Sequence, residues 1–294
     1  MSVAGQTDAA AGKTVQDALD AAAGRLAAAG VEAPRREAQL LMAHARACTL
    51  ARVLADAEDP LDADGAAAFD AAVRQRAARK PLSRIVGSRE FWSLEFRLGP
   101  AVLDPRPDSE TLVRAVLDRV ADRGAPLRLL DLGTGSGCLL LALLQELPNA
   151  GGLGLDRDPA AAEAARANAA ALGLAGRAEI RCADWADGLD GRFDVVVCNP
   201  PYVATHEIDT LAPEVARYDP RGALDGGLDG LDAYRALAPR LDGWLAADGL
   251  AALEVGQGQA EAVAALLRAA GLRSPASVCD LAGVPRCVLA SPAG

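Results

Sequence analysis

The stretch RLLDLGTGSGCLLLALLQEL, residues 128–147, decides the fold class of this chain. It begins as a short apolar strand, continues through the glycine loop Gly133–Gly137, and ends as an apolar helix from Cys138 to Leu147. Glycine lets the backbone approach a ligand closely, and the start of a helix offers free N–H groups. Strand, glycine loop and helix in this order predict the first unit of an α/β cofactor-binding domain.

The spacing of these glycines narrows the class of cofactor. A dinucleotide fingerprint, G-x-G-x-x-G, would need glycine at position 138, where the chain has Cys138. A P-loop would need lysine and serine or threonine after the last glycine, and neither follows. The loop therefore argues against a nicotinamide dehydrogenase and against a nucleoside triphosphatase.

The next two strands end in residues that suit a nucleoside. Residues 152–155 form the second strand and lead into Asp156, an acid placed to accept hydrogen bonds from ribose hydroxyls. Residues 179–182 form the third strand, followed by Asp184 and Trp185. That pair could hold adenine, with an acceptor for its amino group and a ring for its face. The alternative for Trp185 is a cap on the edge of the sheet.

The fourth strand carries the second motif, FDVVVCNPPY, residues 193–202. Its run of valines is typical of a strand buried on both faces. Two prolines then stop the hydrogen-bonded ladder at Asn199 and leave a rigid turn at the carboxyl end of the strand. Ligands of open α/β sheets bind at that end.

This turn suits recognition of an NH2 group. The side-chain oxygen of Asn199 can accept one N–H of an amide or aromatic amine, and the carbonyl of Pro200 can accept the other. The ring of Tyr202 can lie against the flat face of the same group. The alternative is a tight loop after a core strand, in which Asn199 satisfies its own backbone.

The remaining strands complete the sheet. A fifth strand is expected at 250–255, and a closing pair at 277–281 and 286–289. Because strands alternate with helices, the seven-stranded sheet should be mainly parallel. The glycine- and aspartate-rich segment 205–232 is interpreted as a functional lid beside the turn.

The chain divides into four parts on composition. Residues 1–13 are small and polar and are expected to be disordered, and residues 14–80 predict a small helical bundle for docking a partner. Residues 81–105 predict a β-hairpin linker, with turns at Gly87 and Gly99. Residues 106–294 form the catalytic domain.

A helix is expected soon after the hairpin, over residues 111–120. Asp108 or Ser109 would be its N-cap, and Glu110 would place an acid in its first turn.

Composition excludes several classes of function. A net charge of −10 over 294 residues argues against a broad phosphate-binding surface. Six cysteines without a CxxC pair predict buried free thiols in a reducing compartment, and two histidines make a metal site improbable. We find no apolar run long enough for a membrane span and no secretory signal, so we expect a cytoplasmic enzyme.

Taken together, these motifs resemble the PrmC/HemK family, the peptide chain release factor glutamine N5-methyltransferases, which are class I S-adenosylmethionine-dependent enzymes. The resemblance covers nearly the whole chain from about Thr14. The segments that carry it are KPLSRIVGSREFW, VLDPRPDSETLV, DLGTGSGCLLLALL, VCNPPYV, YDPRGALDGGLDGLDAYR and EVGQGQ. It implies a Rossmann-like methyltransferase domain after the helical bundle and hairpin.

The resemblance also implies roles for individual residues. Asp156 would bind the cofactor ribose, Trp185 would lie by the adenine, and Asn199 would bind the target amide beside the methyl group. The loop residues that would line the methionine part of S-adenosylmethionine are Gly133, Thr134, Gly135, Ser136 and Gly137. The residues that would form the substrate cleft are Asn199, Pro200, Pro201 and Tyr202. The family methylates the glutamine of the release factor's Gly-Gly-Gln loop.

The sequence leaves one alternative substrate open, because NPPY-type turns also bind the amino groups of nucleic-acid bases. An N6-adenine or N2-guanine methyltransferase is therefore the rival hypothesis, and the acidic charge speaks against it. A non-catalytic binding module is disfavoured by the glycine loop, Asp156 and NPPY occurring together. We expect a monomer whose partner is a release factor.

Overall fold

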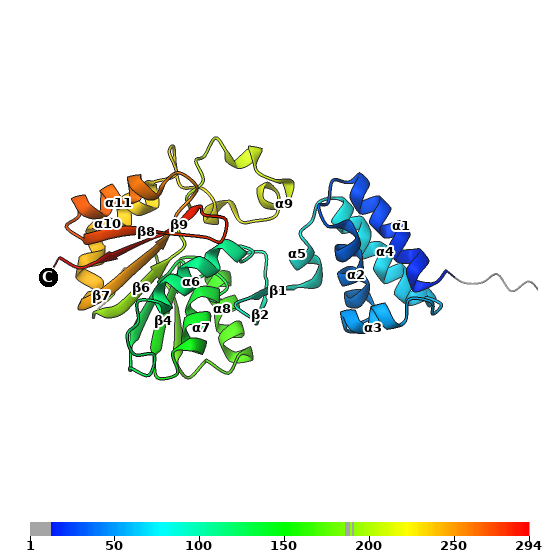
Figure 1. Cartoon of the computed structure of the whole chain (residues 1–294), viewed down its shortest axis with the longest axis horizontal. Helices are drawn as coiled ribbons and strands as arrows, with labels where there is room; N and C mark the ends of the chain where they lie inside the picture. The colour runs from blue at the N-terminus through cyan, green and yellow to red at the C-terminus, as the bar shows by residue number, and fades with distance from the viewer. Residues whose placement is uncertain (1–12, 186–188, 190, 294) are drawn as a thin grey trace, which may run out of the picture. The chain divides into compact units, whose positions relative to one another are not determined.

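The computed structural model describes residues 13–185, 189 and 191–293. Of residues 1–13, which were expected to be disordered, only Lys13 lies within the described part. The chain divides between Val86 and Gly87 into two compact units, and each is described by itself (Figure 1). Within the described residues, no helix is long and apolar enough to cross a membrane.

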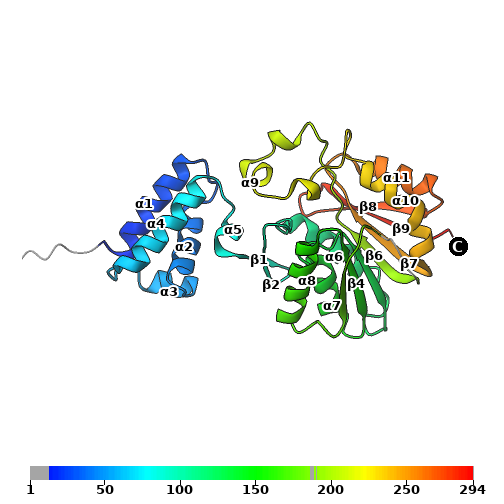
Figure 2. The same ribbon diagram turned by 180° about the vertical axis from the view of Figure 1, so that it is seen from behind.

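The first unit is a helical bundle, as the sequence predicted (Figure 2). Thr14 and Asp17 form a reciprocal capping box that starts the first helix, and Pro34 starts the second. Leu19, Leu26 and Val31 are among the apolar residues buried in the core of the bundle. Its helices are α1 (Val15–Ala28), α2 (Pro34–Ala45), α3 (Leu50–Ala55), α4 (Ala63–Ala77) and α5 (Leu82–Val86).

The second unit opens with the predicted β-hairpin, β1 (Ser88–Phe91) and β2 (Leu94–Arg97). Its turn is formed by Trp92 and Ser93, both with positive φ, while Gly87 and Gly99, where the sequence predicted turns, flank the two strands. The turn is held from outside, because the backbone N–H of Trp92 donates to Glu110 and its indole N–H donates to Glu146, each across 2.9 Å.

A seven-stranded sheet follows, in the order β5-β4-β3-β6-β7-β9-β8. The five strands from β5 to β7 run parallel, and β9 and β8 close the sheet antiparallel, which confirms the predicted mainly parallel arrangement. The strands are β3 (Arg128–Leu132), β4 (Gly151–Asp156), β5 (Ala178–Cys182), β6 (Phe193–Cys198), β7 (Leu245–Glu254), β8 (Arg273–Cys279) and β9 (Pro285–Ser291).

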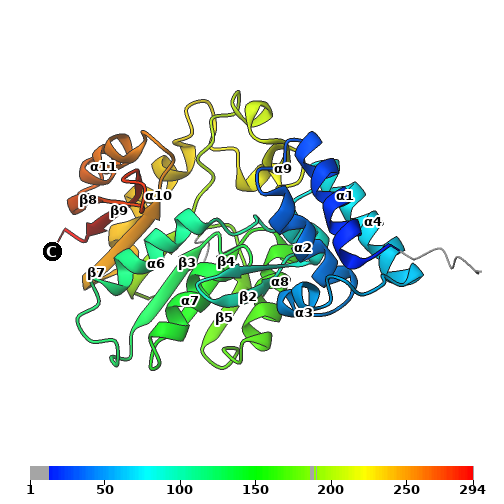
Figure 3. The same ribbon diagram turned by 45° about the vertical axis from the view of Figure 1, so that its right-hand side comes forward.

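Helices cover both faces of this sheet. Along β6, Val195 and Val197 pack on the face covered by α6, α7 and α8, while Val196 and Cys198 pack on the face covered by α10 and α11. Figure 3 shows α10 and α11 beside β7, β8 and β9. These helices are α6 (Glu110–Leu117), α7 (Cys138–Glu146), α8 (Pro159–Ala171), α10 (Asp232–Trp244) and α11 (Ala260–Ala269).

The topology fixes where a ligand can bind. Strand order reverses between β3 and β6, and Leu132 pairs with Cys198 at the carboxyl ends of these strands. The glycine loop and the NPPY turn therefore emerge side by side at a topological switch point.

The segment between β6 and α10 carries only short helical turns and projects from one edge of the sheet (Figure 1). It is anchored to the NPPY turn, since Val203 N–H donates to Leu224 and Gly226 N–H donates to Val203. Its helical turns are η2 (Ile208–Thr210), α9 (Pro213–Ala216) and η3 (Arg221–Ala223).

Candidate active site

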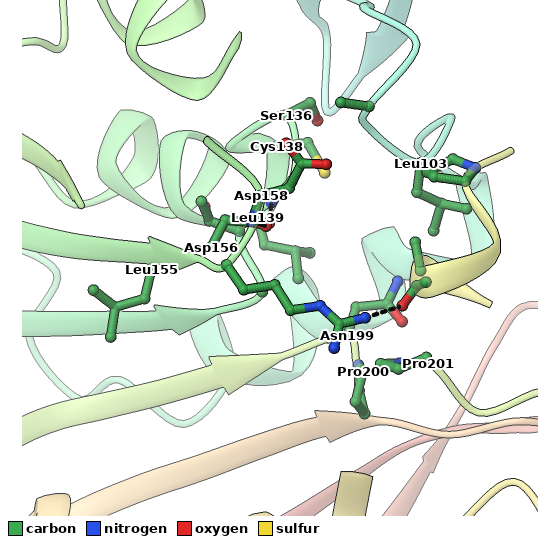
Figure 4. A pocket seen from close by; sticks show the side chains of 18 of the residues that line it. Leu103, Ser136, Cys138, Leu139, Leu155, Asp156, Asp158, Asn199, Pro200 and Pro201 are labelled. Carbon is green, nitrogen blue, oxygen red and sulfur yellow. Dashed lines mark hydrogen bonds between the residues drawn. The ribbon is translucent and has the colours of Figure 1, made fainter. Parts of the chain in front are cut away.

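A cavity of about 240 Å³ opens at the carboxyl edge of the parallel strands. Each of four strands sends its following loop to the wall: β3 supplies Gly133–Ser136, β4 supplies Asp156–Asp158, β5 supplies Ala183–Trp185, and β6 supplies Asn199–Pro201. Figure 4 shows Ser136, Asp156 and Asp158 together with Asn199, Pro200 and Pro201 around this space. Further wall residues come from 101–109 and 220–223.

Most residues singled out from the sequence line this one cavity. Two of them do not. Gly137 is the N-cap residue of α7, with φ of 82°, and Tyr202 lies behind the NPPY turn against the carboxyl end of β7.

The glycine loop turns its backbone toward the cavity. Gly135 has φ of 55°, and the nearest atom that a Cβ there would meet is 4.0 Å away. The loop is held to the neighbouring strand, because Gly133 and Thr134 both donate N–H groups to the carbonyl of Leu155 at 2.8 and 2.9 Å. A ligand can therefore lie directly against a fixed stretch of backbone.

Asp156 is locked at the end of β4 by two backbone donors. Its Oδ2 accepts from Gly135 N–H at 2.8 Å, and its Oδ1 accepts from Asp158 N–H at 2.9 Å. Each carboxylate oxygen can accept a second hydrogen bond. The residue is thus oriented to bind a pair of hydroxyl groups in the cavity.

Trp185 lies on the same wall, at the end of β5. It has φ of 43°, an uncommon value for a residue with a side chain, and it packs partly buried against the core on the α10 side. Its neighbours Ala183 and Asp184 also line the cavity. The ring can therefore contact a ligand and cap the sheet at the same time.

The side chain of Asn199 contacts Ser109, a residue that the sequence predicted only as a helix cap. Its amide nitrogen Nδ2 donates to the hydroxyl of Ser109 at 3.3 Å, which leaves Oδ1 available as an acceptor. Ser109 is the N-cap residue of α6, as predicted, but its side chain makes no capping hydrogen bond. Ser109 ends the 3₁₀ turn η1 (Pro107–Ser109), which precedes α6, and its hydroxyl contacts Asn199.

Tyr202 is joined to a buried acid. Its hydroxyl donates to Oε1 of Glu254 at 3.3 Å, and its carbonyl accepts from the side-chain amide of Gln259 at 2.9 Å. Burial raises the pKa of the Tyr202 phenol, and the charge of Glu254 raises it further. The phenol is therefore a neutral donor across the physiological range.

Two buried carboxyl groups lie behind the cavity. Asp131 accepts a hydrogen bond from the Thr134 hydroxyl at 2.6 Å. Burial has the larger effect on its pKa and raises it to about 7, although this hydrogen bond lowers it. Burial likewise raises the pKa of Glu254 to about 7, while the hydroxyls of Ser109 and Tyr202 and the charge of Arg286 lower it. Acids with pKa values near neutrality are typical of functional sites.

Glu254 and Gln259 carry no sequence-predicted role, and the contact between Ser109 and Asn199 was not expected. The sequence did contain a signal for Glu254, because this acid ends the apolar strand β7 at the carboxyl edge of the sheet. Burying a charge is costly unless it is paired, so such a residue indicates a functional or structural partner. No local pattern could have revealed the contact between Ser109 and Asn199.

Family models match both units of the chain. The PrmC N-terminal domain matches residues 17–87, and the methyltransferase small domain matches residues 108–217.

Curated relatives match over almost the full length. The release factor glutamine methyltransferase of Rhodospirillum rubrum is 49% identical over 272 residues, which cover 92% of this chain and 83% of that protein. Its counterpart in Cereibacter sphaeroides is 47% identical over 274 residues, covering 93% and 97%. That of Moorella thermoacetica is 45% identical over 279 residues, covering 94% and 98%.

Solved structures share the fold at low identity. The catalytic domain of hMettl16, in complex with MAT2A 3'UTR hairpin 6, has a TM-score of 0.55 at 17% identity over 76% of this chain and 82% of that one. The ribosomal protein L11 methylase of Lactobacillus delbrueckii subsp. bulgaricus has a TM-score of 0.50 at 21% identity over 68% and 86%. Both show the class I methyltransferase fold. On its sequence relatives and family models, the chain belongs to the PrmC/HemK family of release factor glutamine methyltransferases, whose methyl donor is S-adenosylmethionine.

Proposed function

We propose that this protein transfers the methyl group of S-adenosylmethionine to the side-chain amide nitrogen of the glutamine in the Gly-Gly-Gln motif of peptide chain release factors. The observation that carries the proposal is one cavity lined by a glycine loop, by Asp156, and by the acceptors of Asn199 and Pro200. Nucleoside recognition and NH2 recognition thus meet in the same space. The names of the relatives point to the same substrate.

The donor set fits the cofactor. The glycine loop offers a backbone surface that a Cβ at Gly135 would obstruct, and Asp156 has acceptors for the ribose hydroxyls. Trp185 supplies a ring for the adenine. When bound, S-adenosylmethionine supplies an electrophilic methyl group on a sulfonium.

The residues of the NPPY turn would supply the grip on the substrate. An amide nitrogen is a poor nucleophile because its lone pair is delocalised into the carbonyl. Asn199 Oδ1 and the Pro200 carbonyl would accept its two N–H groups, while Tyr202 supports the turn from behind. Such positioning can lower a barrier by on the order of 7–11 kcal/mol. The amide proton is then lost to water.

The helical unit would supply the partner specificity. Its matched family model is a PrmC N-terminal domain, and its core is fully formed by α1 to α4. We propose that residues 14–80 dock the release factor. We also propose that the protein acts in the cytoplasm and as a monomer. Slower amide hydrogen exchange in α1 to α4 on addition of release factor is the expected sign of docking.

Methyl transfer from labelled S-adenosylmethionine tests the function. The acceptors are purified release factor, its Gln→Ala variant in the Gly-Gly-Gln loop, DNA and RNA. Label on the wild-type release factor alone would establish both the substrate and the target residue. Label on nucleic acid would keep the cofactor site and move the function to base methylation.

A further inference from the structure

One wall of the cavity comes from a segment with little regular structure. Residues 219–223, here called the strap, follow α9 and supply Pro220, Gly222 and Ala223 to the lining. The strap is the part of the expected lid, 205–232, that reaches the cavity. Its own backbone forms only the 3₁₀ turn η3, so contacts with the rest of the domain must hold it in place.

The first of these contacts is an ion pair at the start of the strap. Arg106 Nη2 donates to Asp219 Oδ2 at 2.5 Å, and the backbone N–H of Asp104 donates to Asp219 Oδ1 at 3.3 Å. The Asp219 side chain is fully buried, and 33% of the Arg106 side chain is exposed. A charge-assisted hydrogen bond that is partly shielded from water contributes more than an exposed ion pair. The strap is thus fixed to the segment before α6, which also lines the cavity.

The second contact lies three residues further along the strap. Arg157, in the loop after β4, donates from its guanidinium to the carbonyl of Gly222 at 3.2 Å. A Cβ at Gly222 would lie 2.8 Å from Arg157 Nη2, so this close approach depends on glycine. Two guanidinium groups from two different parts of the wall therefore hold the same short stretch of backbone.

The far end of the strap is anchored without either guanidinium. The backbone N–H of Val203 donates to the carbonyl of Leu224 at 2.9 Å, and Gly226 N–H donates to the carbonyl of Val203 at 2.8 Å. Breaking the two guanidinium contacts would therefore leave the strap attached to the NPPY turn. Leu224 is then a hinge about which residues 219–223 can move.

The size of the cavity requires such a movement. At about 240 Å³ it is smaller than the roughly 300–1,000 Å³ typical of pockets for drug-sized ligands. A ligand that joins a nucleoside to an amino acid fills this space closely and cannot pass unless a wall moves. The loops after β3, β4, β5 and β6 are fixed by the sheet, whereas the strap is fixed by side chains.

We propose that the strap is a gate of the cofactor cavity, kept closed by its two guanidinium contacts, and that it opens for S-adenosylmethionine to enter and for S-adenosylhomocysteine to leave. Asp219, Arg106 and Arg157 are then positioning residues, which act through the wall and not on the reacting atoms. The inference rests on the proposed function, since it takes this cavity to be the cofactor site.

A gate has a kinetic signature that a plain wall lacks. Both guanidinium contacts join protein groups only, so weakening one favours opening of the empty and of the filled cavity alike. The association and dissociation rate constants should then rise together, and their ratio, the Kd, should change little. A wall that merely contacts the ligand behaves differently, because its loss raises the dissociation rate constant and the Kd in proportion.

The first variant to measure is Asp219→Asn. It keeps the shape of the side chain and an acceptor for Asp104 N–H, but it removes the charge that pairs with Arg106. We expect both rate constants for S-adenosylhomocysteine to rise by about tenfold or more, with a Kd within about threefold of wild type. A Kd that rises as much as the dissociation rate constant, or rates equal to wild type, would overturn the inference.

Stopped-flow tryptophan fluorescence gives both rate constants, because Trp185 lines the cavity. The slope of the observed rate against the concentration of S-adenosylhomocysteine is the association rate constant, and the intercept is the dissociation rate constant.

Glu261→Gln is the matched control. Glu261 Oε1 accepts from Arg268 Nη2 at 2.5 Å, the same separation as in the pair at the strap, but this pair lies on α11. Both rate constants should equal those of wild type. A rise in Glu261→Gln as large as in Asp219→Asn would mean that the strap is not the cause, and it would overturn the inference.

Arg157→Ala tests the second contact and carries the test if the melting temperature shows that Asp219→Asn does not fold. Arg157 is exposed, so its loss leaves the core intact. The two rate constants should again rise together. A rise in the dissociation rate constant alone would mean that Arg157 only contacts the ligand, and it would overturn the gate.

Failure of the proposed function looks different, because the readout here is binding. Rate constants that rise together in a protein that methylates no release factor would support the gate and overturn the proposed function alone. Unchanged rate constants in both strap variants of an active methyltransferase would overturn the inference alone. Wild-type protein that binds neither S-adenosylmethionine nor S-adenosylhomocysteine would overturn both.

Discussion

The side-chain amide of Asn199 donates a hydrogen bond to the hydroxyl of Ser109, which lies 90 positions earlier in the chain. This contact joins the turn after β6 to the turn before α6, and both line the cavity. With the amide nitrogen of Asn199 turned to Ser109, its amide oxygen Oδ1 is left as an acceptor for a substrate.

Asn199→Ala should abolish most turnover while leaving cofactor binding intact. The variant removes Oδ1, one of the two acceptors that orient the substrate amide, and we expect the kcat to fall by roughly two orders of magnitude or more, as for the loss of a positioned group. Turnover of labelled S-adenosylmethionine onto release factor measures kcat, and isothermal titration measures cofactor affinity.

Asn149→Ala serves as the control for this variant, because Asn149 also donates its side-chain amide, to the carbonyl of Gly124 at 2.8 Å, but on an exposed loop outside the cavity. It should keep wild-type kcat. Turnover near wild type in Asn199→Ala would show that the NPPY amide does not orient the substrate.

Asp156→Ala should weaken cofactor binding. The variant removes the carboxylate, so the N–H groups of Gly135 and Asp158 lose their acceptor. The ribose hydroxyls would lose their acceptors as well. Hydrogen bonds to charged groups contribute about 1.5–3 kcal/mol, so we expect the Kd for S-adenosylmethionine to rise by roughly tenfold to a hundredfold. Calorimetric titration without release factor measures it directly.

A comparable carboxylate at the other end of the sheet gives the control. Asp194 Oδ2 accepts from Arg128 N–H at 2.7 Å, where β3 and β6 begin. Asp194→Ala should cost stability but leave the Kd unchanged. An equal loss of affinity in both variants would mean that Asp156 acts through the fold and not through the cofactor.

The sequence was sufficient for the fold because its signals are local. The alternation of apolar strands and helices indicated a mainly parallel sheet, and glycine and proline marked the ends of β3 and β6. Parallel strands bring their carboxyl ends to one edge, so Asp156, Trp185 and Asn199 could be expected near one another without any structure. The cavity does bring them together.

What the sequence could not supply depends on distant partners. Asp108-Ser109-Glu110 has the composition of a helix N-terminus, and only the position of Asn199 shows that the serine has another partner. The hairpin turn at Trp92 and Ser93 is equally hidden, because positive φ is unfavourable for such residues until Glu110 and Glu146 hold them.

Asp131→Asn should change how stability depends on pH. Burial raises the folded-state pKa of Asp131 from 3.8 to about 7, so the folded state binds the proton more tightly than the unfolded chain does. This contribution to the free energy of unfolding is largest below pH 3.8 and is lost as the pH rises to about 7, by on the order of 4 kcal/mol. Asp131→Asn lacks this loss.

The measurement is urea unfolding of wild type and Asp131→Asn without cofactor, at pH 5 and at pH 8. The stability of the variant relative to wild type should improve between the two values, because only the wild type must hold a buried charge at pH 8. A constant difference between the two proteins at both pH values would mean that Asp131 does not titrate in this range.

Gly230→Ala should displace the NPPY turn. A Cβ at Gly230 would lie 2.3 Å from the carbonyl oxygen of Tyr202 and 2.6 Å from Nε2 of Gln259, and Gly230 has φ of 75°. The backbone of Tyr202 would have to move, so we expect the kcat to fall by about tenfold or more, since small misplacements of positioning groups are costly. The melting temperature should fall as well.

Gly243→Ala is the matched control, because Gly243 lies in α10 and a Cβ there would meet nothing within 4 Å. Alanine favours a helix over glycine by about 1 kcal/mol, so this variant should be at least as stable as wild type and equally active. Wild-type kcat in Gly230→Ala would show that the segment holding this glycine does not keep the NPPY turn in place.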